Sequence, residues 1–537
     1  MLKSVPDGET LVAQAPAANG AATAVDDRRA DAARVEQALG ALPQVRRARV
    51  EAQRTEAGTH RLVAYVVPAE EPAAAPAGPD AAPAASAEQK RVDEWNVIYE
   101  WVYGELPQSG ALGDNFVGWH SSYTNLPIPL DEMREWRDEA VRRILAHRPR
   151  RVLEIGVGTG LLMAHVAPAC EQYTATDFSA TVIARIAEQL SAQPQLAGKV
   201  ELLNREANDF SGLVEGHYDL VVINSVVQYF PNAVYLADVL AGALRMVRPG
   251  GAVFAGDIRN LRLLPSFRTA VLARGQLPAD DPRGALAQVE QSCHDEREML
   301  VDPDFFDAVR LANPQAGALD LRIKRAVHHN ELSRHRYDAV LYREPVQAVR
   351  LDEAVLLGWG RDVTSLDDLR DFLAESACPV ARPETLRVVG VPNRRVGHET
   401  AAARLLEDLA PLEIVERRLE SAPSGPAGAD AAADAQPDPE DFHTMAEGLG
   451  YRAVITWASS GLPDQIDVVL TREPGDPDLG PIVPYVASAP ADRPMISYGN
   501  NPARAAIDGA LIAALRTALS EVLPEELMPS VFVTEAP

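Results

Sequence analysis

The chain has 537 residues, of which 47% are hydrophobic and 24% charged, and its formal net charge is −26. This length and composition predict about two to four globular domains with a large core. The negative charge argues against nucleic acid as a partner, because binding a phosphate backbone requires a basic face. No signal pattern and no membrane-spanning apolar run is present, so we expect a cytoplasmic protein without membrane contact. Cys170, Cys293 and Cys378 have no paired spacing, so we expect neither disulfide bonds nor a metal site.

The N-terminal region contains two stretches of low complexity. Residues 1–24 are rich in alanine and glycine and are expected to be a disordered tail. Residues 69–90 have the composition of a linker. Between them, residues 25–68 predict a helix followed by strands over 48–52 and 61–67. One helix and two strands are too few to be stable by themselves.

The stretch 151–162 organises the rest of the sequence. A run of β-forming residues containing Glu154 is followed by Gly156, Gly158 and Gly160 and then by helix-forming apolar residues. This pattern predicts a strand, a tight turn and a helix start, whose amides favour a carboxylate or phosphate. The glycines let the backbone bend sharply and approach a ligand closely. A dinucleotide fingerprint would place its third glycine one position later, and Glu154 would repel a pyrophosphate, so a dehydrogenase is the less favoured interpretation.

An alternation of strands and helices follows the glycine turn. It predicts an α/β fold, a mainly parallel sheet of seven strands with helices on both faces. Residues 346–475 carry further strand and helix patterns around a low-complexity insert at 421–436 and are expected to form an accessory lobe. The predicted strands lie near 151–155, 172–176, 200–203, 220–223, 252–255, 321–325 and 338–342 in the sheet, and over 386–391, 451–457 and 466–471 in the lobe.

The C-terminal part is predicted to contain a linker and an amphipathic helix. Residues 476–499 are proline-rich and read as a linker, and a helix begins the stretch 500–537. Its apolar residues recur at helical spacing, at Ile507, Leu511, Leu515, Leu519 and Val522.

An acid stands at the end of the second predicted strand. Asp177 lies about 20 residues after the first glycine, the spacing at which a carboxylate accepts hydrogen bonds from both hydroxyls of a ribose. Phe178 follows it and is assigned to the same site. The alternative is a helix cap, for which Asp177 and Ser179 are both suited. We favour the ribose role because an independent glycine turn precedes it.

Polar residues also follow the third and fourth predicted strands. Asn208 and Asp209 follow the third, and Asn224, Ser225 and Gln228 follow the fourth, at the sheet edge where open α/β folds bind ligands. With the glycine turn and the acid, these groups resemble in order and spacing the class I S-adenosylmethionine (SAM)-dependent methyltransferases. The resemblance implies a Rossmann-like seven-stranded sheet and SAM as the cofactor.

The resemblance covers residues 150–345 and implies a role for each polar group. Asn208 or Asp209 would hydrogen-bond the adenine amino group, the alternative being a polar turn. Asn224 and Ser225 would face the methionine part of SAM. The aromatic residues that follow Gln228 are as compatible with plain packing as with ligand contact.

Further segments narrow the family. They resemble the methyltransferase domains embedded in nonribosomal peptide synthetases, with a core over 91–345 and a coverage of about 90–475. The matching segments are 116–123, 256–262, 300–306, 330–338 and, in the accessory lobe, 386–393.

The two flanks resemble the halves of one small domain. Residues 34–68 and 504–533 are similar to the small α+β C-terminal subdomain of an amino-acid adenylation domain, interrupted by the methyltransferase. In that family such an insertion accompanies methylation of the backbone α-amine. The large adenylating subdomain and the Gly-Lys motif are absent from the sequence, so we expect no amino-acid activation. We expect the remnant to be a scaffold or a docking surface for other synthetase modules or a small helper protein.

The catalytic candidates are Asn330 and Glu331, expected at the substrate end. Glu331 would accept a proton or a hydrogen bond from an amine. An α-amine has a reference pKa of about 7.7–8.0, so a base is useful but contributes less than positioning of the nucleophile. The alternative for Glu331 is a structural ion pair with Arg334 or Arg336.

These residues favour N-methylation of an aminoacyl or peptidyl thioester held by a carrier protein. The alternatives are an O- or C-methyltransferase and a non-catalytic SAM-binding module. C-methylation requires a stronger base, and the sequence near Glu331 offers no His-Glu pair beyond His328 and His329.

Trp119 and Tyr123 either close an aromatic lid over the cofactor or belong to the core.

Overall fold

Two units make up the chain, Met1–Ala81 with Ile507–Pro537 and Ala82–Ala506. The computed structural model describes residues 19–54, 60–69, 87–105, 111–275, 277, 281–374, 383–421, 436–472, 480–524 and 527–533. Within these ranges, no helix combines the length and the apolar composition that crossing a bilayer requires.

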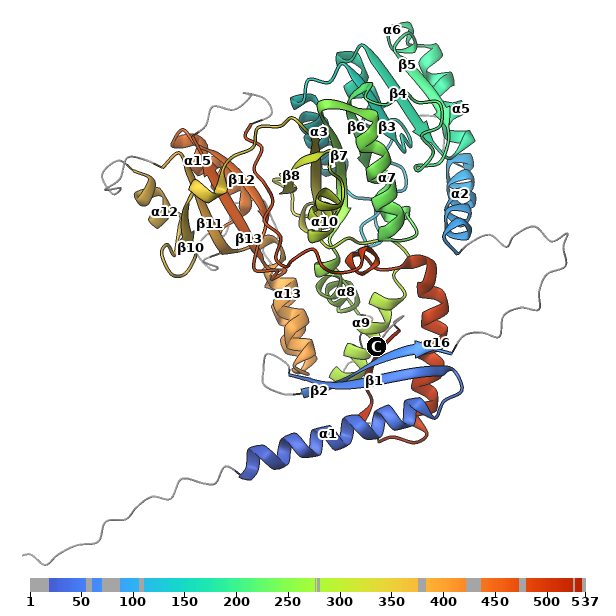
Figure 1. The fold of residues 1–537 in the computed structure, drawn as a ribbon, viewed down its shortest axis with the longest axis vertical. Helices are drawn as coiled ribbons and strands as arrows, with labels where there is room; N and C mark the ends of the chain where they lie inside the picture. The colour runs from blue at the N-terminus through green and yellow to red at the C-terminus, as the bar shows by residue number, and fades with distance from the viewer. Residues whose placement is uncertain are drawn as a thin grey trace, which may run out of the picture. The chain divides into compact units, whose positions relative to one another are not determined.

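A seven-stranded sheet forms the centre of the larger unit, and all seven predicted strands are present in it (Figure 1). The strands are β3 (Arg151–Ile155), β4 (Gln172–Asp177), β5 (Val200–Asn204), β6 (Tyr218–Asn224), β7 (Val247–Arg259), β8 (Ala316–Ile323) and β9 (Arg336–Arg343). Their order is β5-β4-β3-β6-β7-β9-β8, and β9 runs antiparallel to the other six strands. The strand order reverses between β3 and β6, which is where open α/β sheets bind ligands.

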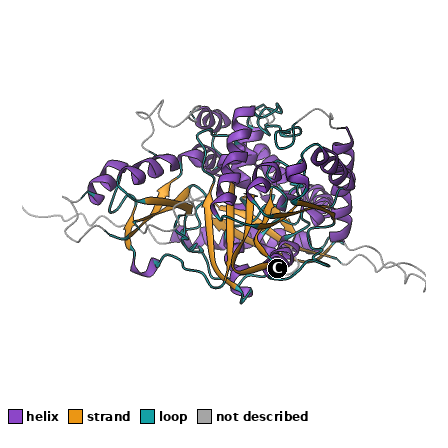
Figure 2. Cartoon of the chain, turned by 90° about the horizontal axis from the view of Figure 1, so that it is seen from above, coloured by secondary structure: helices purple, strands orange, loops and turns teal. Residues whose placement is uncertain are grey.

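Helices flank the strands, as the colouring by secondary structure shows (Figure 2). Side chains of β6 alternate between two hydrophobic clusters, with Leu220 and Val222 in one and Val221 and Ile223 in the other. This alternation is the one expected of a strand buried on both faces. The helices are α2 (Ala87–Glu105), α3 (Leu130–Ala146), α4 (Met163–Val166), α5 (Ala180–Ser191), α6 (Pro194–Ala197), α7 (Ala233–Met246), α8 (Leu264–Leu272), α9 (Pro282–His294), α10 (Asp304–Ala312) and α11 (Glu331–Arg334).

A four-stranded sheet forms the accessory lobe. It contains the three predicted strands and one that the sequence did not indicate, β10, in the order β10-β11-β13-β12. Of the low-complexity insert 421–436, residues 422–435 lie outside the described residues. The elements are β10 (Val355–Gly358), α12 (Leu366–Leu373), β11 (Thr385–Pro392), α13 (Arg394–Glu407), α14 (Leu412–Glu420), α15 (Pro439–Gly448), β12 (Arg452–Trp457) and β13 (Gln465–Thr471).

The described part of the expected linker 476–499 is attached to the sheet. The Tyr485 N–H donates to the Leu319 carbonyl of β8 at 2.9 Å. The Tyr485 hydroxyl donates to Asp304 at 2.8 Å, and the Ser488 hydroxyl donates to the same carboxylate at 2.6 Å. This stretch is therefore a packed segment of the larger unit rather than a free connection.

The smaller unit joins the two ends of the chain in one sheet. Its elements are α1 (Asn19–Gly40), β1 (Val45–Arg54), β2 (His60–Pro68), α16 (Pro502–Ser520) and β14 (Ser530–Val533). β14 pairs in parallel with β2, so the two flanking segments supply one three-stranded sheet. Leu515 and Leu519 of α16 are fully buried in its core, whereas Val522 is 60% exposed. α1 begins at Asn19, inside the stretch expected to be a disordered tail.

Candidate active site

A cavity of about 780 Å³ opens at the carboxyl ends of the central strands. Residues that directly follow β3, β4, β6 and β7 line it, together with residues of α2, α8 and α11. It therefore lies at the point where the strand order reverses, and every wall is built from residues of the larger unit.

The glycine turn after β3 forms one wall of this cavity. Gly156, Gly158 and Gly160 have φ values of 78°, 52° and 78°, in the region that only glycine adopts readily. A Cβ on Gly156 would lie 2.3 Å from Val226 Cγ2, and Gly156 and Gly158 both line the cavity. The helix after the turn, α4, has only four residues, so the predicted anion site at a helix N-terminus has little support.

Asp177 occupies the cavity wall next to this turn. Its Oδ2 accepts the Gly158 N–H at 3.0 Å and its Oδ1 accepts the Ser179 N–H at 2.9 Å. Ser179 caps α5 by accepting the Val182 N–H, so the cap predicted for Asp177 or Ser179 is made by Ser179. Burial raises the pKa of Asp177 to about 6. Phe178 also lines the cavity.

Glu154 is a second buried carboxyl group in the cavity wall. Its side chain is part of β3 and its Oε2 accepts the Tyr173 hydroxyl at 2.8 Å. Burial raises the pKa of Glu154 to about 8, so the group is mostly protonated at neutral pH.

The residues after β6 present unpaired acceptors. Asn224 Oδ1 and Gln228 Oε1 are buried, line the cavity and have no hydrogen-bond partner among the described residues. The Ser225 hydroxyl donates to Asp257 at 2.7 Å, and Asn224 Nδ2 donates to Ser225 at 3.1 Å. Buried polar atoms are almost always paired, so these two oxygens indicate a ligand with hydrogen-bond donors.

Aromatic rings form the opposite wall. Tyr229 lies 4.8 Å from Trp95 and 4.9 Å from Tyr99 of α2, measured between ring centroids. Tyr99 also lies 6.3 Å from Phe178. The sequence left Tyr229 open between packing and ligand contact; in the structure its ring packs on α2, and the residue also lines the cavity.

Comparison with known proteins gives the family. A family model described as a methyltransferase domain matches residues 153–253. A probable non-canonical nonribosomal peptide synthetase, CymA, of Salinispora arenicola is 36% identical over 503 residues, which is 94% of this chain and 6% of that protein. The chondramide synthase cmdD of Chondromyces crocatus is 36% identical over 487 residues, 88% of this chain and 12% of that protein. The chain carries a methyltransferase domain of the nonribosomal peptide synthetase type.

The chain corresponds to only a small part of each relative. It spans 6% of the length of CymA and 12% of the length of cmdD. Among solved structures, the magnesium protoporphyrin IX methyltransferase of Synechocystis with bound S-adenosylhomocysteine covers 48% of this chain and all of that chain, with a TM-score of 0.31 and 12% identity. At that score the likeness carries no argument of its own.

The cavity of this methyltransferase fits its cofactor, SAM. The sheet order is that of the class I fold, and the turn at Gly156 leaves a space that a Cβ would fill. The unpaired acceptors Asn224 Oδ1 and Gln228 Oε1 match the donors of an amino acid, and the ionised form of Asp177 can accept the hydroxyls of a ribose.

Five of the predicted site residues, Tyr123 among them, do not line the cavity. Asn208 and Asp209 are exposed, and Asp209 accepts the Ser211 N–H in a polar turn; Glu206 and Ala207 line the cavity instead. Asn330 caps α11, accepting the Leu332 and Ser333 N–H groups, while its Nδ2 donates to Glu132. It is thus a structural residue rather than a substrate contact. Gly160, the third glycine of the turn, does not line the cavity.

Tyr123 also lies outside the cavity wall, although Trp119 is part of it. The Tyr123 hydroxyl lies 2.9 Å from both His335 Nε2 and Glu399 Oε1. Trp119 lines the cavity and also packs against a small buried apolar cluster, whereas Tyr123 belongs to a polar network.

Glu331 lines the cavity and is 8% exposed. Its Oε2 accepts the Ser122 N–H and its Oε1 accepts the Ser122 hydroxyl, both at 2.9 Å. The alternative ion pairs are absent among the described residues: Arg334 pairs with Glu399 and Arg336 with Asp257.

A His-Glu pair that the sequence did not reveal lies near Glu331. His335 lines the cavity, and its Nε2 is 2.8 Å from Oε2 of Glu399 in α13 of the lobe. The expectation that no such pair exists beyond His328 and His329 was wrong. Glu399 is 64 positions further along the chain, on helix α13 of the accessory lobe, and no local pattern marks it.

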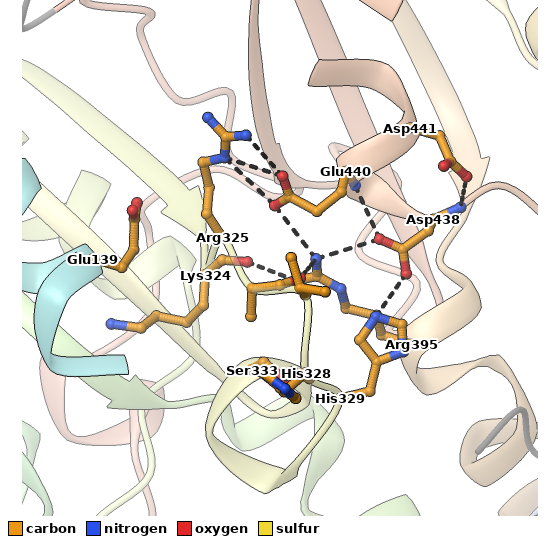
Figure 3. Close-up of polar contacts among 12 residues, drawn as sticks. Glu139, Lys324, Arg325, His328, His329, Ser333, Arg395, Asp438, Glu440 and Asp441 are labelled. Carbon is orange, nitrogen blue, oxygen red and sulfur yellow. Dashed lines mark hydrogen bonds and ion pairs between the residues drawn. The ribbon is translucent and has the colours of Figure 1, made fainter. Parts of the chain in front are cut away.

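The lobe is attached beside the active site by buried charges (Figure 3). Arg395, 1% exposed, donates to the carbonyls of Lys324 and Ala326 at 2.6 and 2.9 Å and contacts Asp438 at 3.3 Å. His329 Nε2 lies 2.9 Å from the same carboxylate. Burial alone would raise the pKa of Asp438, but His329 and Arg395 lower it to about 2. These contacts fix the segment that leads into α11.

Proposed function

We propose that this methyltransferase methylates the α-amine of an aminoacyl or peptidyl thioester held by a carrier protein. The observation that carries the proposal is Glu331, a buried carboxylate on the cavity wall with no cationic partner among the described residues. Burying an unpaired charge is costly, whereas an amine or ammonium would compensate it. A hydroxyl or carbon acid would compensate it less well, so the site favours nitrogen.

The remaining residues would hold the cofactor. Asp177 would accept the ribose hydroxyls, and the donors of the methionine part would reach Asn224 and Gln228. Phe178, Glu206 and Ala207 border the region next to Asp177 that suits the adenine. When bound, SAM supplies an electrophilic methyl group, so the protein acts chiefly by holding the amine at near-attack distance.

A carrier protein is proposed as the partner because several similar proteins, CymA among them, are named as nonribosomal peptide synthetases. The smaller unit supports the same context. Its two halves are joined by the pairing of β14 with β2, as expected of an interrupted adenylation subdomain. We propose that this unit contacts other synthetase modules or a helper protein.

The proposal is tested with SAM and a panel of aminoacyl-loaded carrier proteins. Mass spectrometry should show a gain of one methyl, and fragmentation should locate it on the amine. A carrier loaded with an N-formyl amino acid is the matched control and should gain none. Methylation of free amino acids alone would refute the carrier, and a methyl that fragmentation locates on carbon or oxygen would refute nitrogen as the acceptor.

C-methylation is the second candidate because His335 and Glu399 form the base that it requires. In that case a substrate deuterated at the α-carbon loses its deuterium as it gains the methyl. Retention of the deuterium eliminates this candidate.

A further inference from the structure

His335 is fixed on three sides. Its Nε2 lies 2.8 Å from Glu399 Oε2 and 2.9 Å from the Tyr123 hydroxyl. The Phe267 ring packs against it edge-on, with 5.0 Å between centroids. The backbone N–H of His335 donates to the backbone carbonyl of Glu331, one helical turn earlier, at 3.2 Å. Glu331 and His335 therefore stand on the same face of this turn, and both line the cavity.

The network assigns the tautomer of His335. The Tyr123 hydroxyl has one hydrogen, which it donates to Glu399 Oε1 at 2.9 Å. A lone pair on Nε2 would then face two oxygens that can only accept, Glu399 Oε2 and the Tyr123 hydroxyl oxygen. Nε2 therefore carries the hydrogen. In the neutral ring the lone pair is on Nδ1. This atom is buried and has no hydrogen-bond partner among the described residues.

The charged groups around the pair support this arrangement. Glu399 is 4% exposed and also accepts Arg334 Nη1 at 3.0 Å. The Arg274 guanidinium lies 5.0 Å from the Tyr123 ring centroid. Burial would raise the pKa of Glu399, but His335 and Arg334 keep it below its ordinary value, so the carboxylate stays ionised.

We infer that His335 Nδ1 takes the proton from the amine during methyl transfer, and that the lobe orients this base through Glu399. Glu331 holds the amine and both its oxygens already accept hydrogen bonds from Ser122, whereas His335 Nδ1 has no partner among the described residues. The inference rests on the proposed function. His335 is then a catalytic residue, and Glu399 and Tyr123 are positioning residues.

The step balances as follows. The substrate ammonium gives one proton to His335 Nδ1, and the freed nitrogen lone pair forms the N–C bond. The C–S bond breaks with its electron pair on sulfur, leaving a neutral thioether and a methylated ammonium. The imidazolium releases its proton to solvent.

The test is the pH profile of His335→Gln with an amide-linked aminoacyl carrier, which does not hydrolyse in base. At pH 6.5 we expect kcat to fall about 100-fold or more. The deficit should shrink above pH 9, because the substrate ammonium then loses its proton to solvent without help from a base. His328→Gln is the matched control, since His328 pairs with Glu135 outside the cavity, and it should leave kcat unchanged.

Two further measurements separate chemistry from folding. S-adenosylhomocysteine affinity, from calorimetry, should be the same in His335→Gln and the native protein. Nitrogen NMR of the native protein should show an unprotonated Nδ1 at His335, and Glu399→Gln should shift this signal. A deficit that is constant from pH 6.5 to 9, or a protonated Nδ1 in the neutral ring, would overturn the inference. Methyl transfer by the native protein to carbon or oxygen would instead refute the proposed function.

Discussion

Ser122 donates both its N–H and its hydroxyl to the two carboxylate oxygens of Glu331, at 2.9 Å each, across 209 positions of sequence. The two bonds fix the plane of the carboxylate on the cavity wall.

Glu331→Gln should therefore impair methyl transfer without impairing cofactor binding. Loss of a charged hydrogen bond costs about 1.5–3 kcal/mol, which corresponds to roughly 10- to 150-fold in rate. Single-turnover assays with loaded carrier measure the rate, and calorimetry with S-adenosylhomocysteine measures the affinity. Ser122→Ala is the graded comparison, because it removes one of the two bonds and should have a smaller effect. Full turnover in Glu331→Gln would remove this residue from the mechanism.

Cofactor affinity should depend on pH through Asp177. Burial raises its pKa to about 6, and the ionised form accepts the ribose hydroxyls. The ligand thus favours the charged form, and affinity should fall as pH decreases through 6, by roughly 10-fold one pH unit below that value. Calorimetric titration between pH 5 and 8 should show this step, and Asp177→Asn should abolish it.

Asp209→Asn is the control for the Asp177 experiment. Asp209 is exposed and lies outside the cavity wall, so the variant should keep the native affinity and pH profile. A loss of affinity in Asp209→Asn would show that the turn after β5 closes on the adenine.

Gly156→Ala should damage both stability and cofactor binding. Its φ of 78° costs an alanine about 1–2 kcal/mol, and its Cβ would also lie 2.3 Å from Val226 Cγ2. Gly216→Ala separates the two effects, because Gly216 has a φ of 67° with open space around it. Urea unfolding should show the larger loss for Gly156→Ala, and adding Val226→Ala should restore part of it. If the two alanine variants lost the same free energy of unfolding, the contact of the new Cβ with Val226 would cost nothing, contrary to this prediction.

Asp438→Asn should destabilise the attachment of the lobe. It leaves Arg395 and His329 buried without their shared carboxylate, a change that costs about 3–5 kcal/mol. The pKa of Asp438 is lowered to about 2, so its stabilisation is present above the ordinary carboxyl pKa and is lost as pH falls toward 2. Asp367→Asn, at an exposed ion pair, should change the unfolding free energy by less than about 0.5 kcal/mol. Similar values for the two variants would contradict this account.

The sequence by itself determined the sheet and the residues at the ends of β3, β4 and β6 that line the cavity, but not Asn208 and Asp209, which lie outside it. Strand patterns are local, and the turn glycines and Asp177 directly follow their strands, so the parallel sheet necessarily brings them to one edge. The lobe strand β10 was missed because it has only four residues, too few for a periodic pattern.

Only the tertiary structure decided the substrate side. Asn330 and Glu331 are neighbours of similar polarity, yet one caps a helix turn and the other faces the cavity, because a single backbone turn sends their side chains in different directions. Tyr123 reaches Glu399 across 276 positions. Contacts at such separations arise from how the lobe packs on the sheet, which no local spacing of residues records.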